Sequence, residues 1–315
     1  LLFAALMLPW TTIRQGYAFP EVLDAVPPAA QISPVTFQAS DGQLQLVGVD
    51  MKEGQSVTPD GGPVSVTLYW RAEEPVAADY ISSVHLLGRE WASVGQIDRY
   101  PAMGMIPTSR WKQGDIYGDE YRIMTRESIA APAALSVAVS LYDDRADRVL
   151  PATSDQGLLL DPLIVGAPVR LAATEPELPD LQARVDVPFE QGITLTGYEL
   201  GMANPGETVP VTLFWQAAQT PDRAYTVFVH LLDQNGERIA GADSPPVNNF
   251  FPTNLWQEGD VIDDIHQLAV PPGLSKGEYQ VLVGLYDPES GVRLQRADDA
   301  GDSVTLPLIV RQGNG

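Results

Sequence analysis

The strongest pattern in the chain is an alternation of apolar residues that occurs twice. Residues 64–70 (VSVTLYW) and residues 209–215 (VPVTLFW) place large apolar side chains at every second position. Such a period of two predicts a β-strand with one face on a core. Trp70 and Trp215, which close the two strands, are 145 residues apart, and we expect both indoles to fill a core.

A spacing of about 145 residues relates further blocks along the chain. The matching pairs are 84–87 with 229–232, 107–108 with 252–253, 111–115 with 256–260, 141–143 with 285–287, 162–165 with 307–310 and, at a spacing of 149, 46–49 with 195–198. So many blocks in nearly constant register indicate an internal duplication. Each copy has about 130 residues, which is the size of a β-sandwich.

The pattern therefore predicts an all-β fold of two tandem β-sandwich domains, jelly-roll or immunoglobulin-like, preceded by a short apolar segment. Helical periodicity is not sustained in either copy. We expect the first sandwich over residues 35–168, a linker over 169–183 and the second sandwich over 184–312. Besides residues 64–70, the first sandwich should have strands at 44–49, 80–87, 115–124, 135–142 and 158–165.

Residues 1–17 open with ten uncharged, mostly apolar residues, LLFAALMLPW. Ten helical residues span roughly 15 Å, about half of a bilayer core. We interpret this stretch as the end of a transmembrane helix or a membrane anchor; a signal-peptide remnant and a segment packed on the fold are the alternatives. Four prolines in residues 18–34 predict a semi-rigid spacer after it.

Charge and composition exclude several classes of function. The chain of 315 residues has 41 acidic and 19 basic residues, a net charge of −22. Such a surface repels phosphate backbones, so we expect no nucleic-acid partner. The absence of cysteine excludes disulfides, thiolate metal sites and cysteine nucleophiles. Three histidines are too few for a histidine-rich metal centre.

Three runs in the second copy carry a resemblance to a known family. They are YTVFVHLLDQNGERIAGADSPP, FPTNLWQEGDVIDD and GEYQVLVGLYDPESGVRL, in residues 225–294. The chain resembles the C-terminal extracytoplasmic β-sandwich region of bacterial membrane proteins similar to the dolichyl-phosphate-mannose-dependent protein mannosyltransferases. The first copy matches more loosely: it lacks the Asn-Gly hairpin and has Met103-Gly104-Met105 where the second has Asn248-Asn249-Phe250.

The resemblance implies a location at the bacterial cell surface, outside the cytoplasm and anchored to the membrane. In that family the catalytic machinery lies in a membrane part that these residues do not include. The resemblance therefore implies a non-catalytic region accessory to a membrane glycosyltransferase-like protein, with glycans or cell-surface proteins as candidate partners. The alternative is a structural cell-surface protein whose sandwiches assemble into a layer or filament.

Five residues form a candidate glycan-binding set: Tyr69, His85, Phe214, Phe228 and His230. Each lies on the strand face opposite the apolar row, so neighbouring strands would present an aromatic ring and a histidine together. We expect weak binding, stronger in the second copy because it has Phe228 where the first has Ser83. The alternative is that a loop or another domain covers this face.

The remaining features favour structure over chemistry. Trp111 and Trp256 open W-x-x-G-D turns, whose glycine should supply a special backbone angle and whose aspartate should close the turn. Acidic clusters at 143–147, 263–264 and 298–302 are typical of solvated turns; calcium is the alternative, although no ordered ligand pattern is present. We find no nucleophile–base or phosphate-binding motif, so no enzyme activity of this chain and no cofactor is expected.

Overall fold

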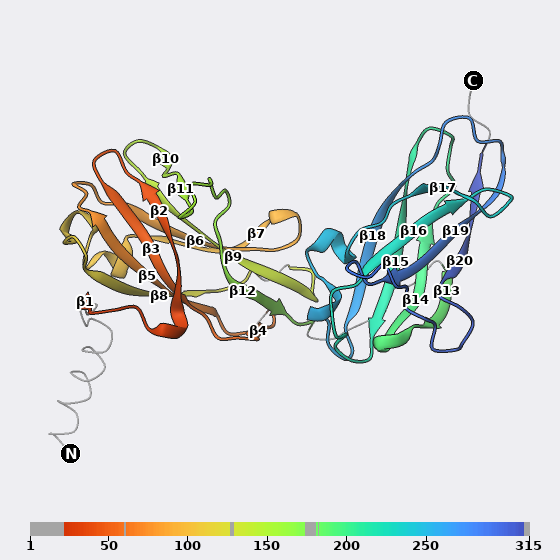
Figure 1. The fold of residues 1–315 in the computed structure, drawn as a ribbon, viewed down its shortest axis with the longest axis horizontal. Coiled ribbons are helices and arrows are strands. Elements are labelled where there is room, and N and C mark those ends of the chain that lie inside the picture. The colour runs from red at the N-terminus through yellow and green to blue at the C-terminus, as the bar shows by residue number, and fades with distance from the viewer. Residues whose placement is uncertain (1–21, 60, 127–128, 174–180, 182, 312–315) are drawn as a thin grey trace, which may run out of the picture. The chain divides into compact units, whose positions relative to one another are not determined.

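The computed structural model describes residues 22–59, 61–126, 129–173, 181 and 183–311. The chain divides into two compact units, which we call the first and the second sandwich. The first contains Leu1–Ile129 and Leu135–Val169, and the second contains Ala130–Ala134 and Arg170–Gly315. Each unit consists of β-sheets, as the alternating apolar pattern predicts (Figure 1).

The first sandwich contains two sheets. One has the strand order β1 (Val22–Leu23), β8 (Ile116–Ile123), β5 (Val64–Glu74), β3 (Gln43–Asp50), β2 (Gln31–Gln38), β11 (Ala152–Thr153). The other has the order β4 (Ser56–Val57), β12 (Ile164–Leu171), β9 (Ala133–Asp143), β6 (Ile81–Leu87), β7 (Ser93–Arg99), and β10 (Arg148–Val149) pairs with β9.

The second sandwich contains two sheets of four antiparallel strands each. One has the order β13 (Ala183–Pro188), β14 (Ile193–Leu200), β15 (Thr208–Ala217), β18 (Val261–Ala269). The other has the order β17 (Arg238–Gly241), β16 (Thr226–Leu232), β19 (Gly277–Tyr286), β20 (Val304–Val310). Alternate residues of β20 are buried and exposed along its whole length, as in a strand with one face on a core.

Helical structure in the described residues is limited to short 3₁₀ turns: η1 (Pro28–Ala30), η2 (Arg89–Trp91), η3 (Pro101–Gly104), η4 (Thr108–Arg110), η5 (Glu190–Gly192), η6 (Pro246–Asn249), η7 (Thr253–Leu255). Among these residues no helix has the length and apolarity needed to cross a bilayer. The membrane segment expected at residues 1–17 lies outside the described part of the chain.

Both sandwiches share one irregularity that demonstrates the duplication. In the first, Leu46 pairs with Trp70 and Gly48 with Tyr69, so one residue of β3 is left over as a bulge. In the second, Leu195 pairs with Trp215 and Gly197 with Phe214, with the same extra residue in β14. Both indoles are fully buried, which confirms their expected place in the cores.

Part of the expected spacer belongs to the first sandwich. β1 pairs with β8, and β2 already begins at Gln31. Within this segment Val26 and Ala30 are buried against Val47 and Tyr69. A proline-rich stretch is extended both as a free spacer and when it packs on a sheet. Here the burial of the apolar side chains of Val26 and Ala30 stabilises packing on the sheet. The prediction of a spacer was therefore wrong for residues 22–34.

The last strand of the first sandwich also differs from the prediction. We expected it over residues 158–165 and a linker from 169, whereas β12 runs from Ile164 to Leu171. The Val139 N–H bonds the Leu163 carbonyl, but in the second sandwich the corresponding Val283 pairs with Val304. Residues 162–165 and 307–310 are therefore similar in sequence but not equivalent in structure, because the first lie at the start of β12 and the second at the end of β20.

Candidate ligand-binding groove

The expected row of aromatic and histidine side chains does not exist, because its strands lie in different sheets. β15, which carries Phe214, belongs to one sheet of the second sandwich, and β16, which carries Phe228 and His230, belongs to the other. Likewise, Tyr69 on β5 and His85 on β6 lie in different sheets of the first sandwich. The chain crosses between sheets after each tryptophan strand, which alternation within single strands cannot reveal.

Tyr69 and Phe214 are buried by packing on the outer faces of their sheets. Tyr69 is 8% exposed and packs with Val26, and a Cβ added to its strand neighbour Gly48 would lie 2.5 Å from Val26 Cγ1. Phe214 is 6% exposed, and a Cβ at its neighbour Gly197 would lie 2.5 Å from a methyl group of Leu181. The alternative that a segment covers this face is thus correct for both residues.

Phe228 is enclosed on the outer face of β16 and β19. Its ring lies over its strand partner Gly284, where an added Cβ would approach Phe228 Cζ to 2.5 Å. The Arg293 guanidinium lies 4.3 Å from the ring centroid, and Arg293 is held by Asp302 at 3.4 Å. Only 1% of Phe228 is exposed, so its ring is not available to stack on a ligand.

His230 completes this closed surface. Its ring centroid is 5.0 Å from that of Phe228, and its Nε2 lies 3.0 Å from the nearer carboxylate oxygen of Asp243. The residue is 8% exposed. Four of the five candidates, Tyr69, Phe214, Phe228 and His230, are therefore packing residues, and the prediction of a stronger site in the second sandwich was wrong.

His85 is the exception, because it lines an open groove on the outer face of β6 and β9. One part of the groove has a volume of about 470 Å³, which is within the range of small-molecule sites. It is lined by Phe37, His85, Leu87, Ala138, Val139, Ser140, Val149–Ala152 and Leu159–Leu163. An adjoining part of about 330 Å³ is lined by Ile81, Ser83, His85, Asp98, Ser140, Tyr142 and Val149. We call the two parts together the β6–β9 groove.

Hydrogen bonds fix the protonation of His85 in the groove. The Ser83 hydroxyl donates to the Asp98 carboxylate, so it must accept from His85 Nε2 at 2.7 Å. Nδ1 of His85 lies 3.2 Å from the Ser93 hydroxyl and shares a second hydrogen bond with it. Because Nε2 carries the proton, His85 cannot act as a general base toward Ser83. In this arrangement Ser83, His85 and Asp98 lack the proton acceptor facing the serine that a hydrolytic triad requires.

Three substitutions between the copies explain why this face is open in the first sandwich and closed around Phe228 in the second. Ser83 pairs with Ser140 where Phe228 pairs with Gly284. Val149 and Arg293 occupy equivalent positions after the corresponding hairpins. The residue that follows each of them shows this: the Leu150 N–H donates to the Leu141 carbonyl, and the Leu294 N–H donates to the Leu285 carbonyl. Small side chains thus leave open the space that a phenyl ring and a guanidinium fill in the second copy.

One side of the groove is formed by a loop that is longer in the first sandwich than in the second. In the first sandwich the chain returns to β9 at Leu163, thirteen residues after Leu150. In the second it returns to β19 at Val304, ten residues after Leu294. The longer loop carries Leu159 and Leu160 along one side of the groove. Leu159 is 67% exposed and Val149 is 58% exposed, so the rim is apolar.

Tyr142 is a groove residue that sequence reasoning missed. It lies on β9 two positions beyond Ser140, on the same outward face, and pairs with Ile81. Its phenol donates to Asp147, and this hydrogen bond is the main reason that the pKa of Tyr142 is raised above 10.0. The ring is therefore held in place at the groove's edge. The alternation along β9 carries the signal, because Ser140 and Tyr142 are two positions apart and share its outward face.

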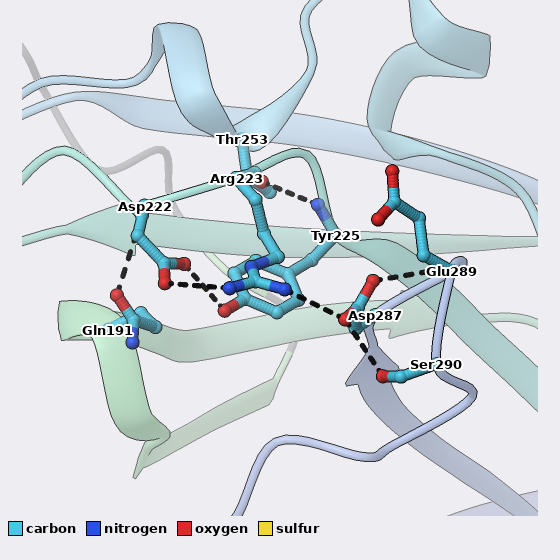
Figure 2. A network of polar contacts seen from close by, with 8 residues as sticks. All are labelled: Gln191, Asp222, Arg223, Tyr225, Thr253, Asp287, Glu289 and Ser290. Atoms are coloured by element: carbon cyan, nitrogen blue, oxygen red, sulfur yellow. Dashed lines mark hydrogen bonds and ion pairs between the residues drawn. The ribbon is translucent and has the colours of Figure 1, made fainter.

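A second polar network stabilises one end of the second sandwich (Figure 2). Arg223 lies between Asp287, at 2.9 Å, and Asp222, at 3.4 Å, and Tyr225 donates to Asp222. Burial and this hydrogen bond raise the pKa of Tyr225 to about 12. Asp287 also accepts hydrogen bonds from the Glu289 N–H and the Ser290 hydroxyl. The carboxylates of Asp222 and Asp287 thus bind groups within turns and the exposed Arg223 side chain. We assign the network a structural role.

The tryptophan turns are structural in both sandwiches, as expected. Trp111 and Trp256 are 4% and 0% exposed, and each indole N–H donates over 3.0 Å to a loop carbonyl, of Ile106 or Phe251. The glycines of the two W-x-x-G-D turns have φ of +84° and +89°. Asp260 closes its turn by accepting the Gln257 N–H at 2.8 Å, whereas Asp115 accepts from Tyr117.

A left-handed turn precedes each tryptophan turn and is tied to the core in the second sandwich. Val247, Asn248 and Asn249 all have positive φ, as do Ala102, Met103 and Gly104 in the first. The Val247 N–H donates over 2.8 Å to Asp264, a fully buried carboxylate that also accepts from Trp215 Nε1.

His266 completes this buried centre. Its Nε2 donates to Asp264 at 2.7 Å and its Nδ1 donates to the Ala242 carbonyl at 2.9 Å, so the ring carries both protons. Burial lowers the pKa of His266, but the hydrogen bond and charge of Asp264, with the Ala242 carbonyl and the charge of Asp243, outweigh it and raise the pKa above 6.5.

The acidic clusters do not converge on a common point within the described residues. Asp143 accepts from the N–H groups of Arg145 and Ala146, Asp298 from Arg296, and Asp264 as described above. No group of three or more potential metal ligands occurs in this part of the chain.

Comparisons with known proteins place the chain in no family. No family model matches it, and no curated protein is significantly similar. Solved structures with a weak likeness include two crystal structures of a glycosyl hydrolase family 2 member from Bacteroides cellulosilyticus, both with a TM-score of 0.25. The identities are 9% and 11%, the matches cover 91% and 90% of this chain, and it spans 34% and 35% of those chains.

Proposed function

We propose that the chain is a non-catalytic binding region that recognises a glycan through the β6–β9 groove of the first sandwich. The observation that supports the proposal most directly is the contrast between the copies, in which Ser83 leaves open the space that Phe228 fills. The same strands accommodate Phe228 and Arg293 in the second copy, so strand packing does not require this face to be open. An open space with a polar floor is a typical ligand site.

The chemistry of the groove suits a sugar. Sugars have apolar C–H faces and hydroxyl groups that both donate and accept hydrogen bonds. The groove offers apolar walls at Val149 and Leu159 and an aromatic edge at Tyr142. Its floor offers the Ser140 hydroxyl and the Asp98 carboxylate. A few such contacts, each on the order of 1 kcal/mol, correspond to sub-millimolar to millimolar affinity.

We further propose that the region acts outside the cytoplasm, anchored to the membrane beside a glycosyltransferase-like part. This placement is supported by the family resemblance of residues 225–294. The coding sequence upstream of Leu1 tests it. Many hydrophobic segments there would support the placement, and a lone anchor or a signal peptide would favour a structural surface protein instead.

The binding proposal is tested by copying the second sandwich into the first. The double variant Ser83→Phe/Ser140→Gly reproduces the Phe228–Gly284 pair and should fill the groove. Titration of oligosaccharides followed by NMR shifts of Tyr142 and Val149, which both line the groove and are kept in the variant, should show saturable binding to the wild type and none to the double variant. Ser109→Phe, which adds a ring at an exposed position away from the groove, is the control. Unchanged binding to the filled variant would refute the proposal.

A further inference from the structure

The β6–β9 groove is lined by two carboxylates, and the basic side chain among its lining residues is that of His85. Asp98 lines one part and Asp161 lines the other, and neither set of lining residues includes lysine or arginine. In the second sandwich, by contrast, Arg293 lies over the corresponding surface and Arg238 lies 3.7 Å from Asp243, the counterpart of Asp98. The second sandwich thus has two arginines, Arg238 and Arg293, at positions where the first sandwich has uncharged residues.

The partners of Asp98 leave its charge in place. Its two carboxylate oxygens accept from the Ser83 hydroxyl and, over 2.8 Å, from Gln96 Nε2, which are both neutral donors. His85 Nε2 lies 3.9 Å away and donates first to Ser83. Asp98 is 44% exposed, so a carboxylate held by two hydrogen bonds still faces solvent in the groove. Such a group is oriented in advance for a cationic ligand.

From this geometry we infer that the groove prefers a glycan with a free amino group, that is, a cationic amino sugar such as an unacetylated glucosamine unit. The inference rests on the proposed function and specifies its ligand. The ammonium group would bind Asp98, hydroxyl groups would bond Ser140, and the apolar ring face would lie against Val149 and Tyr142. The net charge of −22 favours the approach of a cation and disfavours uronic acids and phosphosugars.

The test compares two oligosaccharides that differ only in this charge. Glucosamine tetramers and N-acetylglucosamine tetramers are titrated into the whole chain at pH 6, with binding measured by calorimetry and by NMR shifts of Ser140 and Tyr142. One partly exposed charge pair predicts about fivefold tighter binding of the amine form. Raising the salt from about 0.05 to 0.5 M should remove most of the difference, because it shortens the screening length.

Two variants separate the specific contact from general attraction. Asp98→Asn keeps the shape of the groove and should reduce the preference for the amine form to about twofold or less. Asp155→Asn removes one charge from an exposed turn that does not line the groove, and it should leave the preference unchanged. An equal loss in both variants would show that only net charge matters and would overturn the inference.

The remaining outcomes distinguish the inference from the function on which it rests. Equal or tighter binding of the acetylated tetramer at the groove would overturn the preference for a cation and leave glycan binding intact. Binding of neither tetramer, nor of any other oligosaccharide, would overturn both. Saturable binding of the amine form that Ser83→Phe/Ser140→Gly abolishes and Asp98→Asn weakens would support the inference.

Discussion

Ser83 and Phe228 occupy equivalent positions on the outer faces of the two sandwiches, and they give those faces opposite characters. Ser83 pairs with Ser140 and lines the β6–β9 groove. Phe228 pairs with Gly284 and is covered by Arg293. Because the surrounding strands keep the same register, the difference comes from side chains and one longer loop, and the chain offers an internal control for each experiment.

Phe228→Ala should destabilise the second sandwich by about 3 kcal/mol, because a ring that is 1% exposed leaves a cavity when it is removed. Chemical unfolding followed by tryptophan fluorescence measures the change. The corresponding Ser83→Ala removes little buried volume and should cost less than about 1 kcal/mol. If Phe228→Ala left stability unchanged, the ring would be exposed in solution and the assignment of Phe228 to packing would be wrong.

Gly284→Ala should also destabilise the second sandwich, by about 1–3 kcal/mol. The added Cβ would lie 2.5 Å from Phe228 Cζ and 2.7 Å from the Asp302 carbonyl oxygen, and the backbone atom cannot easily move. Gly201→Ala is the matched control, since a Cβ there meets no atom within 4 Å. Comparable melting temperatures for the two variants would contradict this account of the glycine.

Thr253→Val should cost about 2–3 kcal/mol although the two side chains have the same shape. The Thr253 hydroxyl accepts the Tyr225 N–H at 2.8 Å and donates to the Arg223 carbonyl at 2.7 Å, at a fully buried position. Thr108 makes the same pair of bonds in the first sandwich, so Thr108→Val should have a similar cost. The exposed Thr208→Val, measured in the same denaturant series, should be nearly neutral.

The second sandwich should lose stability as the pH rises above 6.5. The pKa of His266 is raised on folding, so its stabilising contribution is fully present below the unfolded pKa of about 6.5 and is lost as the pH rises through the folded pKa. Hydrogen exchange of the Val247 amide reports on it locally, because that N–H bonds Asp264, the carboxylate paired with His266.

The control for this pH dependence is His266→Gln, which should abolish the change in Val247 protection beyond the intrinsic pH dependence of exchange. Asp264→Asn should weaken protection at every pH, because the amide loses the charged acceptor. Protection in the wild type that stays constant between about pH 6 and 9, after correction for intrinsic exchange, would contradict the raised pKa of His266.

The sequence predicted the fold because alternation and repetition are local signals. Trp70 and Trp215 lie in the cores where the pattern placed them, and the glycines of both W-x-x-G-D turns adopt the expected backbone angle. The proline-rich residues 22–34 were misassigned because their burial depends on Tyr69, a contact that composition does not encode.

The site was predicted less well, because its position depends on how strands are distributed between two sheets. Outward residues such as Phe214 and His230 look alike whether they face water or a covering side chain. Only His85 of the candidate set lies in the groove. The sequence shows that Phe228 stands where the first copy has Ser83. Whether the larger side chain forms a binding surface or closes it depends on Gly284 and Arg293, which pack against the Phe228 ring and cover it.

The bulge shared by β3 and β14 changes which alternate positions of the strand face the core. Before it Leu46 faces the core opposite Trp70, and after it Val49 faces the core opposite Leu68, so the buried parity changes from even to odd. Because Val47 is the extra residue, its loss would remove the bulge and leave Leu46, Gly48 and Val49 opposite the same partners, whereas loss of Gln45 would turn Leu44 away from the core. A one-residue deletion should therefore be better tolerated at the bulge than at a regularly paired position of the same strand.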